Sequence, residues 1–425
     1  MTDHWRLTAT AMAAGLRHGS MTSEALVASC LARIAEREAA VQAWEWLDPE
    51  AALAEARARD AAPAKGPLHG VPVGIKDIID TCDMPTACGS PIYAGRRPER
   101  DADCVARLRA AGAVILGKTV TTEFATFRPG KTRNPRDPDH TPGGSSSGSA
   151  AAVGAGMVPL ALGSQTVGSV IRPASYCGVV GFKASQGRLS LEGVKPLAVD
   201  LDSLGCFART VADVALWFAA LAGEPPPAAD AAPRRIALVR TAQWQEARLE
   251  TRQAVEAAAE VLAQAGAEVV EPSLPAEFER LAALQDVIFC AGAAAALAPE
   301  RAAHRSLLSP QLQAILERGA AVSADELAQA AGVAQRCRER FDQLFGEVDL
   351  VLAPAAPGEA PAGLESTGDP LFSRMWTLLL GPCLSLPAAR GPKNLPVGVQ
   401  LIGRRGADRT FLGDALWAEA ALGLA

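Results

Sequence analysis

The sequence GGSSSGSAAAVGAGMVPLALGSQTVGSVIRPASYCGVVGFK, residues 143–183, is dense in glycine, serine and alanine and carries almost no charge. Ordinary loops are polar, and ordinary core elements repeat Leu, Ile and Val at a regular period, so this stretch resembles neither. Small residues at this density indicate that the backbone approaches another segment or a ligand closely. Hydroxyl residues recur along it: Ser145, Ser146, Ser147, Ser149, Ser164, Thr166 and Ser169. Hydroxyls among glycines, in nearly uncharged sequence, are what a nucleophile with a backbone oxyanion pocket requires.

Two segments of this stretch, GGSSSGSAAAV and GSQTVGSVIRPASYCGVVGFK, resemble the amidase signature family of serine hydrolases. That family uses a Ser–Ser–Lys triad in place of Ser–His–Asp. By this resemblance Ser169 is the nucleophile, Ser145 is the middle serine on a cis peptide bond, and Lys76 is the lysine. The similarity extends over roughly the whole chain. It therefore implies one α/β domain over residues 1–425, with a twisted mixed β-sheet surrounded by α-helices and a signature core at about 66–220.

The segment GPLHGVPVGIKDIIDT, residues 66–81, predicts a buried strand, because an apolar run is bounded by Gly and Pro. Lys76 lies inside this run, and a buried ammonium group is costly unless it has a partner or a chemical use. Burial lowers the pKa of a lysine, so a neutral amine can accept a proton. The alternative is a structural lysine paired with Asp77 or Asp80. The serine motifs downstream favour the functional interpretation.

The resemblance also assigns candidate oxyanion donors, the backbone N–H groups of Thr166, Val167, Gly168 and Ser169. The family's usual Asp-Thr-Gly-Gly-Ser stands here as Gln-Thr-Val-Gly-Ser at 165–169. The glutamine removes a charge. The valine keeps its N–H group, and its side chain is expected to narrow the pocket.

Arginine stands third after the candidate nucleophile, as Arg172 in Ser-Val-Ile-Arg-Pro, where the family usually has it second. This variant resembles malonamidase-like members, whose arginine engages a substrate carboxylate. A fixed guanidinium suits bidentate carboxylate recognition, so Arg172 and Gly144 are candidate substrate-binding residues. The alternative is a structural ion pair, and the sequence leaves both open. Unchanged activity of Arg172→Lys on carboxylated amides would contradict the substrate role.

Two other motifs match unrelated enzymes, but their surroundings argue against both. GAVILGKT at 112–119 satisfies the P-loop pattern, yet its apolar residues themselves predict a strand, and a helix precedes it. GSSSG at 144–148 satisfies the nucleophile-elbow pattern, which requires a hydrophobic strand before it and a histidine after it. A Pro-rich loop precedes it, and the only downstream histidine, His304, lies in a helical context.

The composition excludes several functional classes. The chain has 425 residues and a net charge of −6 with dispersed basic residues, so no nucleic-acid surface is expected. No apolar run reaches membrane-spanning length and no signal-peptide pattern begins the chain, which predicts no membrane association and a cytoplasmic protein. Nine scattered cysteines predict reduced thiols, and five histidines without ligand spacing predict no metal site. No organic cofactor is expected either.

Most of the remaining sequence is expected to form helices and strands that support the site without taking part in the chemistry. The expected elements are helices within 6–60, 103–111, 149–156 and 250–345, strands at 113–116, 157–162, 235–240 and 349–354, and an exposed Pro/Ala-rich loop at about 223–235. Residues 163–169 are expected to form a loop. Pro173 is expected to hinder a helix directly after Ser169, because proline disfavours a helical conformation at the preceding residue. The segments 375–387 and 394–404 are expected to close the sheet.

The resemblance thus implies an amidohydrolase that cleaves a carboxamide, or a related amide, ester or carbamate bond, through an acyl-enzyme on Ser169. Neutral Lys76 takes the proton of Ser145 while Ser145 takes that of Ser169, and backbone N–H groups meet the oxyanion. The expected partners are a small-molecule amide and water, and the resemblance favours a homodimer.

Two alternatives stay open. One is a protein like the ammonia-releasing subunit of a glutamine-dependent amidotransferase, which supplies ammonia for aminoacyl-tRNA transamidation and implies partner subunits and tRNA. The short chain, the dispersed basic residues and the departures at 165–172 argue against it. The other is a non-catalytic binding member of the family, and the retention of Lys76, Ser145 and Ser169 together argues against that. The sequence does not name the substrate.

Overall fold

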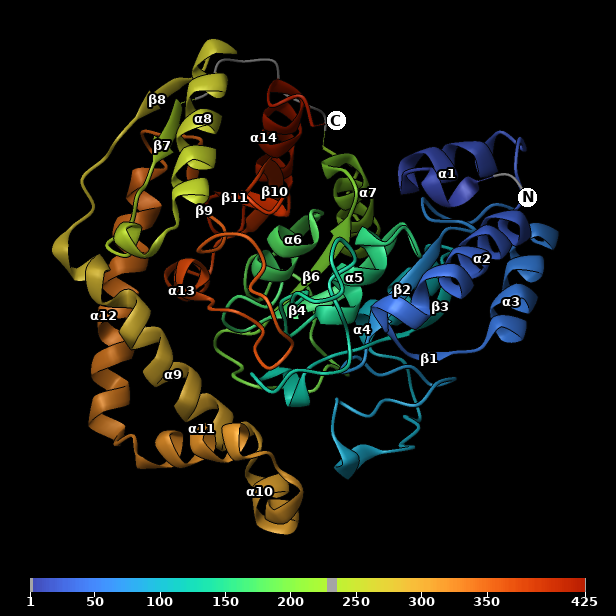
Figure 1. Ribbon diagram of the computed structural model, residues 1–425, viewed down its shortest axis with the longest axis horizontal. Helices are drawn as coiled ribbons and strands as arrows, with labels where there is room; N and C mark the ends of the chain where they lie inside the picture. Colours follow the sequence, from blue (N-terminus) through green and yellow to red (C-terminus); the bar gives the residue numbers. More distant parts are fainter. Residues whose placement is uncertain (1–2, 228–234, 425) are drawn as a thin grey trace.

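An eleven-stranded mixed β-sheet runs through the molecule, with helices packed around it (Figure 1). The computed structural model describes residues 3–227 and 235–424. Along the sheet the strands follow the order β1-β3-β2-β4-β6-β5-β10-β11-β9-β7-β8. One sheet therefore takes strands from both halves of the chain, which confirms the expected α/β class. The Pro/Ala-rich loop expected at about 223–235 falls largely outside the described residues.

The strands are buried on both faces in the middle of the sheet. Their bounds are β1 (Trp44–Leu47), β2 (Pro72–Lys76), β3 (Val114–Thr119), β4 (Leu160–Gln165), β5 (Val180–Lys183), β6 (Ser203–Ala208), β7 (Arg235–Leu238), β8 (Glu268–Val270), β9 (Leu350–Pro354), β10 (Cys383–Arg390) and β11 (Pro396–Ile402). Parallel pairs form two blocks, β3–β2–β4 and β9–β7–β8, and antiparallel pairs join these blocks. Every residue of β2, β4 and β6 is buried, which explains their unbroken runs of apolar and small residues.

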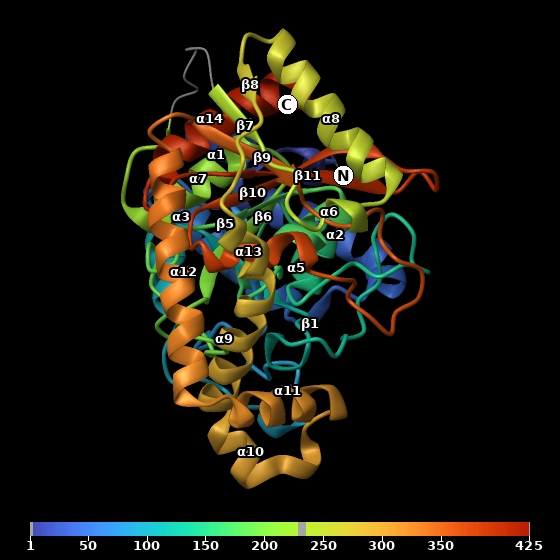
Figure 2. The same cartoon turned by 90° about the vertical axis from the view of Figure 1, so that its left-hand side faces the viewer.

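The helices cover the sheet and also extend beyond it. Their bounds are α1 (Ala9–Arg17), α2 (Ser23–Val41), α3 (Pro49–Ala61), α4 (Asp103–Ala110), α5 (Ser147–Gly154), α6 (Ile171–Cys177), α7 (Val211–Ala222), α8 (Leu249–Gln264), α9 (Leu281–Ala296), α10 (Ala298–His304), α11 (Pro310–Ala321), α12 (Ala324–Leu344), α13 (Leu371–Leu378) and α14 (Asp408–Ala421). Helices α9–α12, residues 281–344, project away from the sheet in both views (Figure 1, Figure 2). We name residues 281–344 the helical arm.

The longest helix of the arm shows why this segment folds as it does. Ser323 caps α12 by accepting a hydrogen bond from the Glu326 N–H at 3.1 Å. Its buried residues recur at helical spacing and form one apolar stripe: Ala330, Val333, Ala334, Cys337 and Phe341. This stripe belongs to the main hydrophobic core, and α12 contacts α9. The periodic burial therefore fixes the arm as part of the fold.

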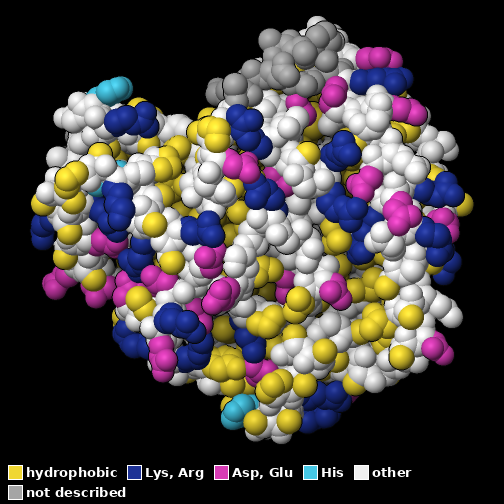
Figure 3. Space-filling view, turned by 180° about the vertical axis from the view of Figure 1, so that it is seen from behind, with side chains coloured by type: hydrophobic (Ala, Val, Ile, Leu, Met, Phe, Trp, Pro, Cys, Tyr) yellow, Lys and Arg dark blue, Asp and Glu magenta, His cyan; other side chains and the backbone are white. Residues whose placement is uncertain are grey.

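On the face seen from behind, Lys and Arg side chains are interspersed with Asp and Glu, and hydrophobic side chains gather in its lower half (Figure 3). Within 3–227 and 235–424, no single helix has both the length and the apolar composition of a membrane span. One bent pair, Ala276–Ala296 with Ala298–Leu307, meets those criteria only when its two helices are joined across a 57° bend.

The stretch 143–183 contains an expectation that proved wrong. β4 extends to Gln165 and includes residues expected to form a loop, because Gly163 pairs directly with Gly205 on β6. A β-carbon at Gly163 would lie 2.7 Å from the ring of Phe207, so glycine permits this close approach. The strand therefore delivers the backbone directly to the loop that carries the candidate oxyanion donors.

Two helices also differ from expectation. α6 begins at Ile171 despite Pro173, because proline in the first turn of a helix gives up no intrahelical hydrogen bond. Within 375–387, expected to close the sheet, the chain is helical to Leu378 and β10 begins only at Cys383. A short apolar run without alternation does not distinguish a buried helix from a buried strand.

The P-loop pattern at 112–119 is strand β3, as its apolar residues predicted. Lys118 is fully buried, and its Nζ donates to the Ile79 carbonyl and to Thr86 Oγ1. Its ammonium group thus binds the protein's own backbone, and no phosphate-binding loop exists at this position.

Candidate active site

Lys76 and Ser145 meet inside the protein, although 69 residues separate them in sequence. Lys76 ends strand β2, where it lies opposite Thr119 of the parallel strand β3. Its Nζ donates to Ser145 Oγ at 2.8 Å and to Ser164 Oγ at 2.9 Å. The Gly144–Ser145 peptide bond is cis, as the resemblance implied. Lys76 and Ser145 are buried, so their contact is shielded from bulk water.

The surroundings of Lys76 favour a neutral amine. Burial lowers the pKa of Lys76 to about 7, and the charge of Asp202 opposes this shift. The structural alternative, a pairing with Asp77 or Asp80, is wrong. Asp77 lies 4.0 Å from Lys118 Nζ, and Asp80 forms an ion pair with Arg96 at 2.8 Å. Lys76 makes no ion pair with any carboxylate of the described residues and binds two hydroxyls.

The second serine segment touches the first. The Ser146 N–H donates to the Ser169 carbonyl at 3.4 Å, which brings the loop after β4 against the start of α5. Ser169 is 7% exposed. Its hydroxyl makes no hydrogen bond with any residue that the structure describes, so it is free to rotate toward an incoming group. Catalytic hydrogen bonds are often incomplete until substrate is bound.

In the loop 166–169 the backbone carbonyl groups are hydrogen-bonded, whereas the backbone N–H groups are not hydrogen-bonded to any described residue. All four carbonyl oxygens accept hydrogen bonds, from Gln285 Nε2, Thr377 Oγ1, the Arg172 N–H and the Ser146 N–H. None of the four N–H groups donates to a described residue. Unsatisfied backbone donors in a buried loop are uncommon, so these N–H groups stay the candidate oxyanion donors.

Thr377 of α13 and Gln165 at the end of β4 hold this loop. Thr377 Oγ1 donates to the Val167 carbonyl at 2.7 Å and accepts from Gln165 Nε2 at 2.9 Å. The Gln165 Oε1 accepts from the N–H groups of Val170 and Ile171, at 2.8 and 3.1 Å, and so caps α6. The glutamine that replaces the family's aspartate therefore fastens the loop to α6 and α13.

Sequence reasoning missed several residues that support the site: Ser164, Asp202, Gln285 and Thr377. Ser164 is one of many hydroxyls in its segment, and Asp202 opens the segment DSLGCFAR, which resembles a family segment but does not itself indicate a role for the aspartate. Gln285 and Thr377 lie far along the chain from the serine segments. The Asp202 carboxylate accepts from Thr166 Oγ1 at 2.6 Å and from the N–H groups of Leu197 and Ala198. No local pattern marks such contacts, because each depends on how distant elements pack.

The structure contradicts the expectation that the Val167 side chain narrows the pocket. The Val167 side chain belongs to the main hydrophobic core and does not line the cavity next to the site, so it does not narrow that cavity. Gly168 has no room for a side chain, because a β-carbon there would lie 2.8 Å from Pro370 Cβ and 3.0 Å from Ser373 Oγ.

Arg172 is buried against the cis peptide. Its Nη2 donates to the Gly144 carbonyl at 2.7 Å and to Thr367 Oγ1 at 3.1 Å. No carboxylate of the described chain forms an ion pair with it, so the structural ion pair is wrong. Its Nε and Nη1 are buried and lack partners. Binding of a substrate carboxylate by Arg172, with Gly144 beside it, stays a prediction.

A cavity of about 220 Å³ opens next to these residues. Ser164, Thr166 and Asp202 form its polar wall, and most of the remaining lining is apolar. Ser164 binds Lys76 and Thr166 begins the loop 166–169, so this cavity adjoins the candidate catalytic groups, although Lys76, Ser145 and Ser169 do not themselves line it. It is the natural place for part of a substrate.

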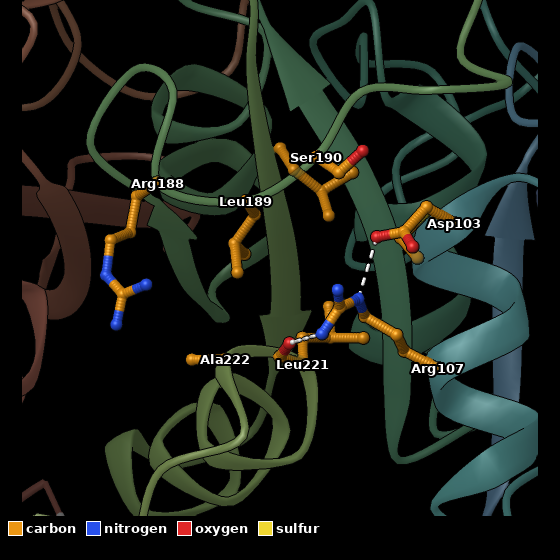
Figure 4. A pocket seen from close by; sticks show the side chains of 9 residues that line it. Asp103, Arg107, Arg188, Leu189, Ser190, Leu221 and Ala222 are labelled. Atoms are coloured by element: carbon orange, nitrogen blue, oxygen red, sulfur yellow. Dashed lines mark hydrogen bonds and ion pairs between the residues drawn. The ribbon is translucent and has the colours of Figure 1, made fainter.

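A second cavity, of about 170 Å³, lies between α4, the end of α7 and residues 188–190 (Figure 4). Its two arginines are already paired, Arg107 with Asp103 at 2.7 Å and Arg188 with Glu224. Its one cysteine, Cys104, is buried, and burial raises the pKa of the thiol to about 12. These side chains offer neither a free charge nor a nucleophile for catalysis.

One group of side chains lies close enough to share a metal ion within the described parts of the chain: Cys82, Asp83 and Asp101. Arg109 already binds both carboxylates, at 2.6 Å to Asp83 and 3.0 Å to Asp101. This arginine occupies the position where a cation would neutralise the aspartates. The expectation of no metal site stays a prediction.

Comparison with known proteins decides the family. A family profile described as Amidase matches residues 25–412. The chain belongs to the amidase family. This family member is 37% identical to one subunit of the glutamyl-tRNA(Gln) amidotransferase of Chloroflexus aggregans, over 98% of this chain and 96% of that relative.

Solved structures of the amidase family agree with this assignment. One described as a crystal structure of amidase superposes with a TM-score of 0.89 at 32% identity, over 97% of this chain and 99% of that one. Native peptide amidase from Stenotrophomonas maltophilia gives a TM-score of 0.82 at 30% identity, over 98% and 96%. The protein is therefore an enzyme that acts on amide carbon–nitrogen bonds, either an amidase or an amidotransferase.

Proposed function

We propose that this enzyme is an amidohydrolase that forms an acyl-enzyme on Ser169, with Ser145 and neutral Lys76 as its proton relay. The observation that carries the proposal is the buried 2.8 Å contact between Lys76 Nζ and Ser145 Oγ, on an amine whose pKa burial lowers to about 7. An amine that is neutral near physiological pH is a competent general base. Ser164 supports this role, because a neutral amine can donate to Ser164 Oγ while its lone pair takes the Ser145 proton.

The relay accounts for every proton. Ser169 Oγ attacks the amide carbon as its proton passes to Ser145, whose own proton passes to Lys76. The N–H groups of Thr166, Val167, Gly168 and Ser169 stabilise the oxyanion, and losing one such donor typically costs about 3–4 kcal/mol of barrier. Protonated Lys76 returns a proton through Ser145 to the leaving amine as the carbon–nitrogen bond breaks. Water then cleaves the Ser169 ester by the same relay and restores neutral Lys76.

The test is intact mass spectrometry after treatment with a phosphonofluoridate or a sulfonyl fluoride, followed by peptide mapping. We expect one adduct on Ser169, formed much more slowly in Lys76→Ala and absent from Ser169→Ala. Ser175→Ala is the matched control, because this buried serine lies in α6 and binds the Gly398 N–H. It should label like the wild type. If Ser169 stays unmodified and no amide releases ammonia, the proposal is wrong.

A second function has a specific observation in its favour. The curated relative of Chloroflexus aggregans belongs to an amidotransferase, and the chain covers 96% of its length. The length of the chain is therefore no longer an argument against this function. In that case the same serine chemistry would release ammonia from glutamine for a tRNA-bound glutamate, with partner subunits. The expected absence of a nucleic-acid partner would then be wrong.

The two functions differ in what the isolated chain can do. An amidohydrolase should release ammonia from simple amides by itself and should gain nothing from tRNA. A member of an amidotransferase complex should act on glutamine, and its rate should depend on partner subunits and on glutamylated tRNA. Ammonia release by the purified chain, measured with glutamine and with a panel of other amides, separates these outcomes.

A further inference from the structure

The cavity beside the catalytic groups has a chemistry that selects one kind of substrate. Its lining includes the apolar side chains of Ile78, Leu191, Val194, Leu197 and Val199. Apart from Val199, which is 64% exposed and marks the mouth, these side chains are buried or half-buried. Apolar walls of this kind favour transfer of an apolar group out of water.

The charged groups in the cavity wall are not free to bind a charged substrate. Among its described lining residues only Lys195 and Asp202 carry charge. Lys195 forms an ion pair with Glu300 of α10, which also accepts from the Tyr93 hydroxyl. The Asp202 carboxylate accepts three hydrogen bonds from the protein itself. A charged substrate group placed here would lose its hydration without gaining a partner.

The size of the cavity sets a lower limit on the group it takes. A volume of about 220 Å³ exceeds the roughly 150 Å³ of an apolar cavity that binds benzene in another protein. A methyl group would therefore leave most of this space empty, whereas a phenyl ring or a chain of four to six carbons, by this rough comparison, would fill it.

We propose that the preferred substrates are amides that carry an apolar substituent of about this size, seated in the cavity formed by Ile78, Leu191, Val194, Leu197 and Val199. This inference rests on the proposed function. The cavity itself disfavours the charged α-amino and carboxylate groups of glutamine, because they find no partners among its lining residues.

The first experiment measures kcat/KM on the wild-type enzyme with two series of amides. One series varies the acyl group from acetamide to octanamide and includes benzamide, and the other varies the amine of N-substituted acetamides. We expect kcat/KM to rise about fourfold or more per methylene in one series until the cavity is full. A rise in the acyl series seats the acyl group in the cavity, and a rise in the amine series seats the amine group. A flat response in both overturns the inference.

The second experiment uses a charge at the mouth. Val199→Asp should lower the ratio of kcat/KM for the best apolar amide over acetamide by roughly tenfold or more, because a carboxylate there disfavours an apolar group. Leu249→Asp is the matched control, since Leu249 is 67% exposed on α8 and lies outside the cavity. Its ratio should equal that of the wild type. Equal ratios in both variants would contradict the inference.

These outcomes separate this inference from the proposed function. If Ser169 is labelled and acetamide is hydrolysed, but neither series shows a length dependence, only the cavity assignment is wrong. If no amide is hydrolysed and Ser169 stays unlabelled, the proposed function itself is wrong.

Discussion

At the scale of single residues, the proposed role of Lys76 makes the reaction rate depend on one titration. Lys76 accepts a proton only when it is neutral, and burial lowers its pKa to about 7. Below that pH the amine is charged, so kcat/KM should fall about tenfold per pH unit, and above it kcat/KM should reach a plateau. The measurement is a profile of kcat/KM from pH 5 to 9 with a neutral amide. An acidic limb centred near the usual pKa of a carboxylate would contradict the role of Lys76.

The same prediction extends to Asp202, whose negative charge raises the pKa of Lys76 against the effect of burial. Removal of this charge in Asp202→Asn should lower the pKa of Lys76 further and move the acidic limb to lower pH. Asp213→Asn is the matched control, because Asp213 is also buried and accepts from the Thr10 N–H at 2.8 Å. Its limb should not move. A shift of equal size in both variants would mean that the limb does not report Lys76.

The proposed catalytic residues came from the family resemblance rather than from local patterns alone. Lys76 stands out as a charge in an apolar strand, but Ser145 and Ser169 are two of several hydroxyls among the glycines, and only the resemblance selects them. The partners of these residues were not predictable. Ser164 resembles the other serines in sequence, and Asp202 matters only because the fold brings it near Lys76.

At the scale of elements, helix α13 holds the loop 166–169, which carries the candidate oxyanion donors, through the hydroxyl of Thr377. Thr377→Val removes the donor to the Val167 carbonyl and the acceptor for Gln165 Nε2. A buried group left unsatisfied costs about 1–3 kcal/mol, and the loop has several ways to relax and recover it. We therefore expect kcat to fall roughly ten- to hundredfold with little change in KM, because the loop contacts the oxyanion more than the ground state.

Steady-state kinetics on three variants check this prediction. Thr377→Ser keeps the hydroxyl and should restore most of kcat. Thr251→Val is the matched control, since Thr251 is fully buried and donates to the Ala356 carbonyl at 3.2 Å, away from the loop. A loss of kcat in the control as large as in Thr377→Val would mean that the effect is general destabilisation.

Element boundaries were predicted less well than the existence of elements, for a physical reason. A sequence window reports the local preference of Pro173 or of the run after Met375, whereas in the structure α6 begins at Ile171 and α13 extends to Leu378. β4 continues to Gln165 because β6, whose paired residues lie 38 to 48 positions further along the chain, pairs with it, and no window at β4 contains that strand.

At the scale of the whole molecule, polar contacts attach the helical arm to residues 93–195, the part of the chain that contains Ser145 and Ser169. The Glu300 carboxylate of α10 binds Lys195 and Tyr93, and the Glu123 carboxylate accepts from the Ser309 N–H at 3.0 Å. Gln285 of α9 donates to the Thr166 carbonyl at 3.2 Å. These contacts join segments more than 100 residues apart, and two of them hold Lys195 and Thr166, which line the cavity next to the site.

Glu300→Gln tests how strongly the arm is held. The substitution keeps the shape but removes the charge that pairs with Lys195, and Glu300 is only 3% exposed. We expect a lower thermal midpoint and faster amide hydrogen exchange in α10 and α11, for a loss of roughly 1–3 kcal/mol. Glu317→Gln is the matched control on the same arm, because its ion pair with Arg305 leaves both side chains more than half exposed. Such pairs contribute about 0–1 kcal/mol, so exchange in the control should stay close to that of the wild type.

The stability difference between the wild type and Glu300→Gln should depend on pH, whereas a purely steric effect of the substitution would not. Burial raises the pKa of Glu300, but hydrogen bonds from Lys195 and Tyr93 outweigh it, so the pKa lies below its usual value of 4.5. A carboxylate with a lowered pKa contributes stability that is present above the unfolded-state pKa and is lost as the pH falls through the folded-state pKa. The gap between wild type and Glu300→Gln should therefore be full at neutral pH and should shrink below about pH 4.5. A gap that stays constant with pH would show that the arm is held by packing alone, and that the Lys195–Glu300 pair adds nothing to its attachment.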